Sequence, residues 1–290
     1  MIFTKNERLS VLGLKERYHR LKPKKEALLN LIDEAELSEG VYNSNAIENS
    51  TLTLRETEKI LLDLEISRNI GLREVFEAKN LATVIEYVQT HYNDDISLDT
   101  ILLLHRMLIT NINEKIAGRF RQTGELVRVG VHIAPLPEHV ISLLSTALVR
   151  YVSNDGIHPI ERIAQFHLEF ETIHPFVDGN GRMGRVLINQ QLSQHDYPQV
   201  VIRHKDKALY YRCLADYQRN DNSKAFSKFL LANVKESLHK RIAYMEGQQI
   251  VPLAKYAHQK KKNVSALLNA ARRQTLPAFR EKGVWKIGIS

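Results

Sequence analysis

The segment His174–Arg185 combines residue types that together could transfer a phosphate-containing group to a hydroxyl. His174 carries an imidazole that can accept a proton near neutral pH. Asp178 offers a hard carboxylate oxygen of the kind that Mg²⁺ binds. Arg182 and Arg185 lie three residues apart, so on a helix they share one face and suit phosphate oxygens. A base, a metal ligand and a phosphate cradle in one segment indicate nucleotide-dependent transfer to a hydroxyl.

The local sequence predicts that these groups lie on a loop followed by a helix. Pro175 and the glycines end a helical pattern, and a new helix is expected to begin near Asn180. Backbone N–H groups of such a loop and the positive end of a helix bind anions. A polar, glycine-rich connector is the alternative. A calcium loop starting at Asp178 does not fit, because Met183 and Asn189 would stand where Gly and Glu are needed, and no HExxH zinc pattern is present.

The segment HPFVDGNGRMGR resembles the signature of Fic-domain proteins, HPFx[D/E]GN[G/K]RxxR, at every specified position. This resemblance implies AMPylation, the transfer of AMP from ATP to a hydroxyl of a protein. His174 would then deprotonate the attacking side chain, and Asp178 would hold Mg²⁺ between the α- and β-phosphates. The other motif residues implied to bind the nucleotide are Gly179, Asn180 and Gly181, as an anion hole for the α-phosphate, and Arg182 and Arg185, with Arg185 reaching the γ-phosphate.

A predicted hairpin within residues 120–137 resembles a second part of the family. Its residues Val129, Gly130, Val131 and His132 look like the flap that lies beside the motif and the nucleotide. An exposed strand there could align a target segment by strand addition. An ordinary surface hairpin is the alternative.

A tyrosine pair, Tyr210 and Tyr211, falls where similar proteins place aromatic residues against adenine. Simple packing is the alternative for paired tyrosines. Gln218 stands where family members often have Asn, so the sequence departs from the family pattern at that position.

Residues 44–49, here called the inhibitory segment, match the family's inhibitory pattern [S/T]xxxE[G/N]. Ser44 and Glu48 are four residues apart and would share a helix face. A carboxylate delivered to Arg185 is expected to form a bidentate ion pair and to take the place of the γ-phosphate. ATP would then bind with its α-phosphate misplaced, which can lower the rate by about 100-fold.

Apolar residues recur at intervals of three and four along most of the chain, which predicts a mainly α-helical fold. The resemblance implies that this is the Fic helical bundle with a β-hairpin flap. Thr53 with Glu56 forms a predicted capping box, and Ser97, Asp99 and Ser142 are expected near helix starts. The predicted helical ranges are 28–35, 54–64, 75–88, 98–108, 140–152, 163–173, 186–192 and 226–238.

Charge is distributed unevenly along the chain. The 290 residues include 41 Lys and Arg against 33 Asp and Glu, a net charge of +8. Residues 251–290 hold nine basic residues and one acid, so the first 250 residues are balanced. This asymmetry indicates a separate basic module with an anionic partner, joined by a linker near Gly247 and Pro252.

Composition also limits the compartment. The single cysteine, Cys213, excludes an internal disulfide, and no apolar run approaches the ~20 residues of a membrane helix. The beginning of the chain lacks an apolar signal region. We expect a cytoplasmic protein without a membrane partner.

The end of the chain resembles winged helix-turn-helix domains of the excisionase type, through LPAFREKGVWKI at residues 276–287. A short helix over Asn263–Ala271 is predicted before it. This resemblance implies phosphate contacts with DNA and a packed Trp285. A solvated basic face and a protein-docking module are the alternatives.

The expected organisation is a helical N-terminal region (1–105), a Fic catalytic core (106–245) and a basic winged helix-turn-helix-like module (251–290). The expected function is protein adenylyltransferase, with ATP, Mg²⁺ and a protein target, inhibited by its own Glu48. De-AMPylation, another Fic nucleotidyl or phosphotransfer reaction, and a DNA-binding regulator with a Fic sensor domain are the alternatives. Homodimers are common among similar proteins.

Overall fold

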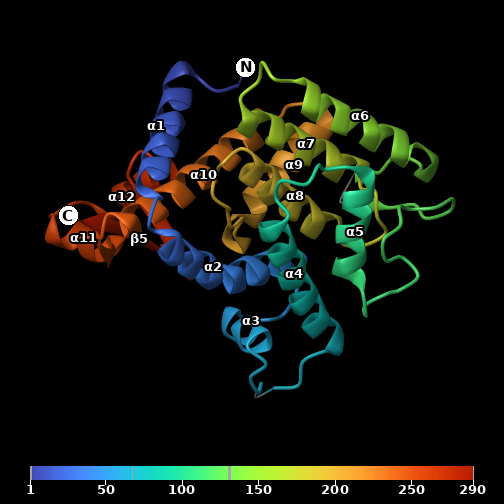
Figure 1. Ribbon diagram of the computed structural model, residues 1–290, viewed down its shortest axis with the longest axis horizontal. Coiled ribbons are helices and arrows are strands. Elements are labelled where there is room, and N and C mark those ends of the chain that lie inside the picture. The colour runs from blue at the N-terminus through green and yellow to red at the C-terminus, as the bar shows by residue number, and fades with distance from the viewer. Residues whose placement is uncertain (1, 67, 130–131, 290) are drawn as a thin grey trace.

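The computed structural model describes residues 2–66, 68–129 and 132–289, and most of them are helical. Two short sheets complete the fold (Figure 1). The helices are α1 (Lys5–Leu21), α2 (Glu26–Ile47), α3 (Leu54–Leu61), α4 (Leu72–Thr90), α5 (Leu98–Ile109), α6 (Val140–Ser153), α7 (Pro159–Ile173), α8 (Asn180–Gln194), α9 (Lys207–Asn220), α10 (Lys224–Met245), α11 (Leu253–Gln259) and α12 (Val264–Arg272), with short 3₁₀ turns η1 (Pro137–His139) and η2 (His204–Asp206). The strands are β1 (Arg128–Val129), β2 (His132–Ile133), β3 (Gln249–Pro252), β4 (Ala278–Glu281) and β5 (Val284–Ile289).

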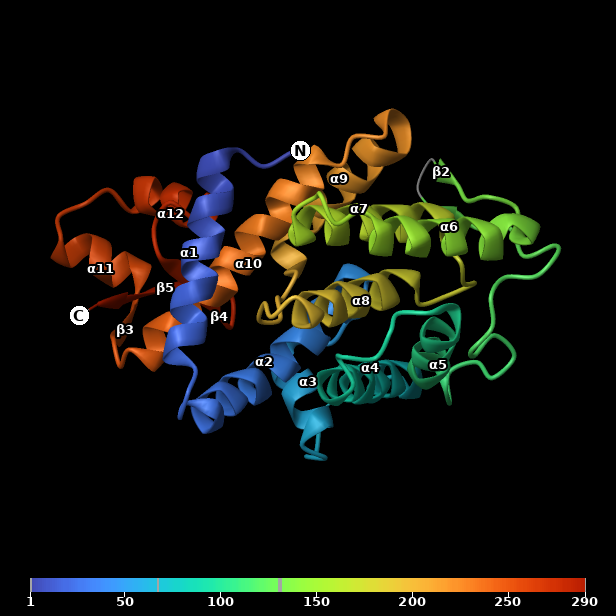
Figure 2. The same ribbon diagram turned by 45° about the horizontal axis from the view of Figure 1, so that its top comes forward.

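Helix α7 lies at the centre of the bundle because both of its faces are apolar. Ile163 and Leu168 are buried in one cluster with α1, α9 and α10. Phe166 and Phe170 are buried in a second cluster with α4, α5 and α8. Figure 2 shows α8 between α7 and α4, and α6 packs against α7. The loop between α7 and α8 is therefore fixed at both ends by the core.

The helix starts agree with most of the predicted capping residues. Thr53 and Glu56 form the predicted capping box of α3, and Ser97 caps α5 by accepting from the Thr100 N–H. Asp99 lies in the first turn of α5. Ser142 likewise lies in the first turn of α6, which begins at Val140, and its hydroxyl donates to the carbonyl of His139, the N-cap residue.

A C-terminal module, residues 249–289, has its own small apolar core and lies at one end of the molecule beside α1 and α10 (Figure 1). Its antiparallel sheet has the order β3-β5-β4, and α11 and α12 connect β3 to β4. The expected linker is only a turn: Gly247, at φ 66°, reverses the chain after α10, and Pro252 lies in β3. The module therefore follows α10 directly.

Within the described part of the chain, no helix combines the length and the apolar character needed to cross a membrane.

Candidate active site

The motif loop is held rigidly between α7 and α8. Helix α7 ends at Ile173, and His174 adopts a left-handed conformation with φ 50° that turns the chain. The Asn180 side chain then closes the loop, because its Oδ1 accepts from the Phe176 N–H at 2.9 Å and its Nδ2 donates to the Phe176 carbonyl at 2.8 Å. Gly179, at φ 85°, is the N-cap residue just before α8, and a side chain there would press against Ile109.

A buried guanidinium, Arg121, joins this loop to the base of the hairpin. Its Nε donates to the His174 carbonyl at 2.8 Å, and its Nη2 donates to the Ile173 carbonyl at 3.2 Å and the Pro135 carbonyl at 2.9 Å. Its Nη1 donates to the Glu125 carbonyl at 3.0 Å. The sequence gives no indication that Arg121 belongs to the site, because nothing around an isolated arginine shows that its side chain will be buried.

His174 is oriented as a base. Its Nδ1–H donates to the Glu171 carbonyl at 3.2 Å, so the network leaves the lone pair on Nε2. Burial lowers the pKa of His174 from 6.5 to about 4. The imidazole is therefore neutral at pH 7 and able to accept a proton.

Three buried polar side chains next to the motif, His167, Glu171 and Tyr210, contact one another. Of these three, only Tyr210 was predicted from the sequence to be a site residue. The Tyr210 hydroxyl donates to the Glu171 Oε1 at 3.4 Å and lies 2.9 Å from the His167 Nε2. Burial raises the pKa of the Glu171 carboxyl to about 8, so it carries a proton at pH 7. The only signal in the sequence was the position of Glu171, one helical turn before His174.

Asp178 lies between two arginines at the mouth of the loop. Its Oδ2 is 2.6 Å from the Arg73 Nη2, and its Oδ1 is 3.1 Å from the Arg182 Nη2. Burial raises the pKa of Asp178, but Arg182 and Arg73 outweigh burial and hold it below its usual value. The buried His105 fixes the backbone here, because its Nε2–H donates to the Asp178 carbonyl at 3.0 Å. Arg73 and His105 come from distant helices, α4 and α5, and sequence analysis did not identify them.

The inhibitory segment lies on Arg185. The Arg185 Nε donates to the Ser44 Oγ at 2.9 Å, and its Nη2 donates to the Ser44 carbonyl and the Glu48 Oε1, both at 2.9 Å. The expected bidentate carboxylate pair is wrong: Glu48 uses one oxygen, because Ser44 occupies the Nε side of the guanidinium. A Cβ on Gly181 would lie 2.2 Å from the Glu48 Oε1, so the carboxylate covers the first turn of α8.

A cavity of about 640 Å³ opens beside these groups. Its lining includes His174, Gly181 and Glu48, and also Tyr211 and Gln218 from α9. The structure thus brings the expected base, the start of α8, the inhibitory carboxylate and the α9 side chains to one space.

The remaining predicted residues border this space in different ways. Tyr210 is among the residues that line the cavity, although it is only 1% exposed. Val129 lines the cavity from β1, whereas the His132 Nε2–H donates to the Thr172 carbonyl at 3.0 Å. Gly130 and Val131 lie outside the described residues.

These features define a helical domain in which a neutral, partly buried histidine, a loop closed by Asn180 and a carboxylate on the second arginine lie close together. Residues 95–192 match the Fic/DOC family. The chain carries a Fic domain, and its mainly helical architecture is the Fic fold.

Similar proteins support this assignment. The chain is 32% identical over 218 residues to the protein adenylyltransferase Fic of Nematostella vectensis, covering 73% of this chain and 50% of that protein. The chain spans about half the length, or less, of the curated relatives it matches. A Fic-domain-containing signalling protein of Bacteroides thetaiotaomicron superposes with a TM-score of 0.74 at 26% identity, covering 82% of this chain and 97% of that chain.

The fold extends to the C-terminal module in another solved structure. A Fic family protein of Desulfovibrio desulfuricans superposes with a TM-score of 0.69 at 21% identity, covering 100% of this chain and 98% of that chain. The arrangement of the Fic domain with a C-terminal module therefore recurs.

Proposed function

We propose that this protein is an adenylyltransferase that moves AMP from ATP to a hydroxyl side chain of Ser, Thr or Tyr in a protein. The observation that carries this proposal is the meeting in one cavity of the neutral His174, the first turn of α8 at Gly181 and the Glu48 carboxylate, which pairs with Arg185. Curated relatives named protein adenylyltransferase support the same class of reaction.

The proposed reaction uses each group in a defined way. The His174 Nε2 accepts the hydroxyl proton as the oxygen forms a bond to the α-phosphorus, and the bond to the β-phosphate oxygen breaks to release pyrophosphate. The N–H groups at the start of α8, beginning with Gly179 and Gly181, bind the α-phosphate oxygens. Arg185 binds the terminal phosphate when Glu48 is displaced.

Asp178 is the residue that fits Mg²⁺. Its carboxylate is ionised and partly exposed, and both of its oxygens already interact with cations, Arg73 and Arg182. Among the described residues no group of three metal-ligating side chains occurs, which suits an ion held by one carboxylate and the phosphates of a nucleotide. Bound there, Mg²⁺ would neutralise phosphate charge.

The proposed activity is inhibited in this conformation. Glu48 holds the guanidinium that would bind the terminal phosphate, and its carboxylate covers Gly181. The negative charge of Glu48 at this place repels the phosphates of ATP and prevents ATP from binding with its α-phosphate correctly placed for the transfer.

The experiment is to incubate the wild type, Glu48→Gly and the double variant Glu48→Gly/His174→Ala with labelled ATP, Mg²⁺ and a lysate. We expect Glu48→Gly to incorporate label about 100-fold faster than the wild type, because misplaced reacting groups cost about that much. The double variant should lose this labelling. Equal labelling by all three proteins would disprove the proposal.

De-AMPylation is a second candidate, favoured by one observation. Glu48 lines the same cavity as His174, where a carboxylate could orient a water molecule towards an AMP-modified side chain. A target pre-modified by Glu48→Gly and then exposed to the wild type tests this candidate. Release of AMP by the wild type, and not by His174→Ala, would support it. Repeating the labelling assay of Glu48→Gly with other nucleotides tests other nucleotidyl transfers, and repeating it with phosphate-labelled ATP tests phosphotransfer.

We also propose that the C-terminal module binds DNA. Helices α11 and α12 followed by the β4–β5 hairpin have the element order of a winged helix-turn-helix. Arg280 cannot contribute, because it is buried on the Fic core, and Lys286 pairs with Glu281. The exposed basic residues of α11, α12 and the turn between them are Lys255, Lys260, Lys261, Lys262, Arg272 and Arg273.

A triple change of Lys260, Lys261 and Lys262 to Gln tests DNA binding without disturbing the core. Affinity for a duplex should fall, and the salt slope should decrease by about 0.9 for each lost phosphate contact. The matched control changes three exposed lysines between α1 and α2 (Lys22, Lys24 and Lys25) to Gln. Equal binding by both variants would remove the proposal. Sedimentation of the same proteins tests the expected homodimer.

A further inference from the structure

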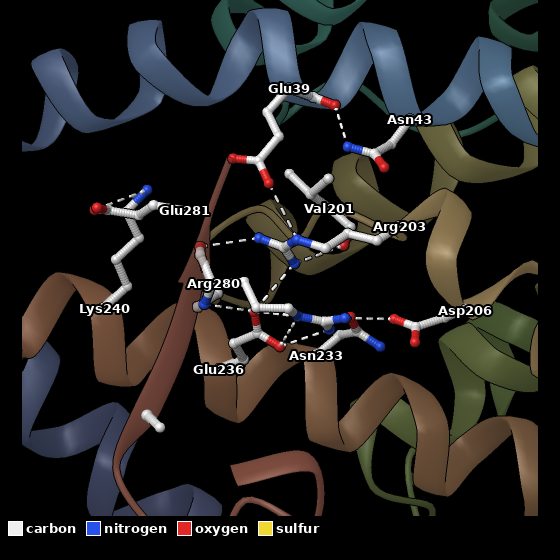
Figure 3. Close-up of polar contacts among 12 residues, drawn as sticks. Glu39, Asn43, Val201, Arg203, Asp206, Asn233, Glu236, Lys240, Arg280 and Glu281 are labelled. Atoms are coloured by element: carbon white, nitrogen blue, oxygen red, sulfur yellow. Dashed lines mark hydrogen bonds and ion pairs between the residues drawn. The ribbon is translucent and has the colours of Figure 1, made fainter. Parts of the chain in front are cut away.

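A network of buried charges connects the inhibitory helix α2 to the C-terminal module. Figure 3 shows carboxylates from α2, η2 and α10 around two guanidiniums, Arg203 and Arg280. We call this the buried charge network. Its members are Glu39 on α2, Arg203 before η2, Asp206 in η2, Glu236 on α10 and Arg280 on β4.

Arg203 is the centre of the buried charge network. Its Nε is 3.1 Å from the Glu39 Oε1, its Nη1 is 3.1 Å from the Glu236 Oε1, and its Nη2 donates to the Arg280 carbonyl at 3.1 Å. The three residues that it contacts, two through their carboxylates and Arg280 through its carbonyl, belong to different elements. Arg203 therefore holds α2, α10 and β4 together at one point (Figure 3).

Arg280 attaches β4 to the same point. Its Nη2 donates to the Glu236 Oε2 at 2.7 Å, and its Nη1 donates to the Asp206 Oδ2 at 2.7 Å. Glu39, Arg203, Glu236 and Arg280 are each at most 9% exposed. Charges at this depth lose their hydration, so the arrangement is favourable only while the partners stay in place.

The hairpin of the module also contacts α2 directly. The Lys282 N–H donates to the Glu39 Oε2 at 3.1 Å, so one carboxylate of α2 is shared between Arg203 and the turn after β4. One helical turn further along α2, the Asn43 Oδ1 accepts from the His204 N–H at 2.9 Å. These contacts lie next to Ser44, the first residue of the inhibitory segment.

Position along the helix connects these contacts to the active site. Glu39 and Glu48 are nine residues apart, which is about 14 Å along a helix. Between Glu39 and Glu48 the helix is continuous to Ile47, so a shift or tilt at Glu39 moves the carboxylate on Arg185. The first half of α2 is anchored separately, by Arg241 and Lys240 on α10 to Glu36.

We propose that the C-terminal module is part of the inhibitory apparatus: its β4–β5 hairpin, through Glu39 and the buried charge network, holds α2 so that Glu48 stays on Arg185. The proposal rests on the adenylyltransferase function proposed above. The position of the inhibitory carboxylate then depends on two places: its own contact with Arg185 and the distant contact of α2 with the module.

Glu39→Gln is the variant that tests this coupling with the least damage to the core. Gln has nearly the same shape, and Arg203 keeps its pair with Glu236, so no buried cation is left without a carboxylate. The initial rate of AMP incorporation should rise about tenfold, the shift in population expected for about 1.4 kcal/mol of lost contact. In the Glu48→Gly background, where the inhibitory carboxylate is absent, the same change should leave the rate unaltered.

Arg17→Gln is the matched control, since Arg17 forms an ion pair with Glu246 away from α2 and should leave the basal rate unchanged. Protection of the α2 amides against hydrogen exchange provides a second readout, and it should fall in Glu39→Gln and not in Arg17→Gln. An active Glu48→Gly with an unchanged rate and unchanged exchange in Glu39→Gln would overturn the proposal and leave the function standing. An inactive Glu48→Gly would overturn the function instead. A rise of equal size in both backgrounds would show that Glu39 does not act through Glu48.

Discussion

His174 combines two properties that normally oppose each other, a largely buried position and the proposed role of a base, which must become charged when it accepts a proton. Burial disfavours the imidazolium, which lowers its pKa to about 4. The Glu171 carbonyl fixes the Nδ1–H tautomer, so Nε2 stays available as the base. The cost is a weaker base than an exposed histidine, and the gain is that the base is unprotonated over the whole physiological range.

This gives a prediction for the pH profile of Glu48→Gly. The active form of a base is the deprotonated one, so kcat/KM falls only as pH drops through the pKa of the free enzyme. An imidazole with a pKa of 6.5 would be about a tenth deprotonated at pH 5.5, whereas His174 with a pKa of about 4 would be almost wholly so. We expect kcat/KM at pH 5.5 to stay within about twofold of its value at pH 7.5. Circular dichroism at both pH values controls for unfolding, and a tenfold fall with the fold intact would contradict the prediction.

At the level of single residues, the sequence predicted the groups that lie close along the chain. The motif from His174 to Arg185 needs only one turn and the start of one helix to bring its groups together. Arg73, Arg121 and Glu171 contact the same motif, but the local sequence gives no signal for Arg73 or Arg121 and only the helical spacing from His174 for Glu171. Their roles depend on how α4, the hairpin base and α7 pack, which is a property of the tertiary fold.

The elements around the site are connected by backbone contacts to Arg121. One guanidinium donates to four carbonyls, from the end of α7, the motif loop and both sides of the hairpin. A planar, five-donor group can do this, whereas an ammonium cannot reach the same directions. The flap and the catalytic loop are therefore expected to move together.

We predict that Arg121→Lys destabilises the protein by about 3 kcal/mol, because at least two hydrogen bonds from a charged donor to buried carbonyls are lost. Urea unfolding followed by circular dichroism measures this value. In the Glu48→Gly background the same change should also lower kcat, since His174 loses the contact on its carbonyl. Arg119→Lys is the control, because Arg119 contacts Glu125 at the partly exposed surface. Similar losses of stability in both variants would contradict the special role of Arg121.

Among the elements, periodicity predicted the helices with a strong apolar stripe and did not predict α1 and α9. Helix α1 has only Val11 and Tyr18 buried, so its apolar stripe is thin. Helix α9 has a regular stripe, Tyr210, Cys213, Leu214 and Tyr217, but the adjacent Tyr210 and Tyr211 suit either contact with a ligand or simple packing. Tyr210 shows why the two interpretations are hard to separate, because the same ring packs in the core and borders the cavity.

At the scale of the whole molecule, the surplus of positive charge divides into two groups. The lysines and arginines of α11 and α12 are exposed, whereas Arg280 is buried against carboxylates of the Fic core. The composition of residues 251–290 could not distinguish these groups, because burial of a charge depends on a partner far away in the sequence. The sequence predicts that the basic residues of the module face an anionic partner. One of them, Arg280, instead attaches the module to the Fic core.

This attachment predicts that the module and the helical core unfold together. Separating them would break the buried ion pairs of Arg280 with Glu236 and Asp206, which favours the attached state. The single tryptophan, Trp285, lies in β5 with the Arg280 guanidinium 4.8 Å from its ring centre, so its fluorescence reports on the module. Far-UV circular dichroism reports mainly on the helical core. We expect the two signals to give the same urea midpoint in the wild type.

The variant Arg280→Met should separate the two transitions, with the tryptophan signal changing at lower urea than the circular dichroism. Met preserves much of the apolar contact of the arginine stem while removing the charge that holds β4 to Glu236. Arg17→Gln, which removes an ion pair between α1 and the end of α10, should keep the midpoints together. If the tryptophan midpoint of the wild type already lies well below the circular dichroism midpoint, the module is only loosely attached, and it could not hold α2 in the way proposed.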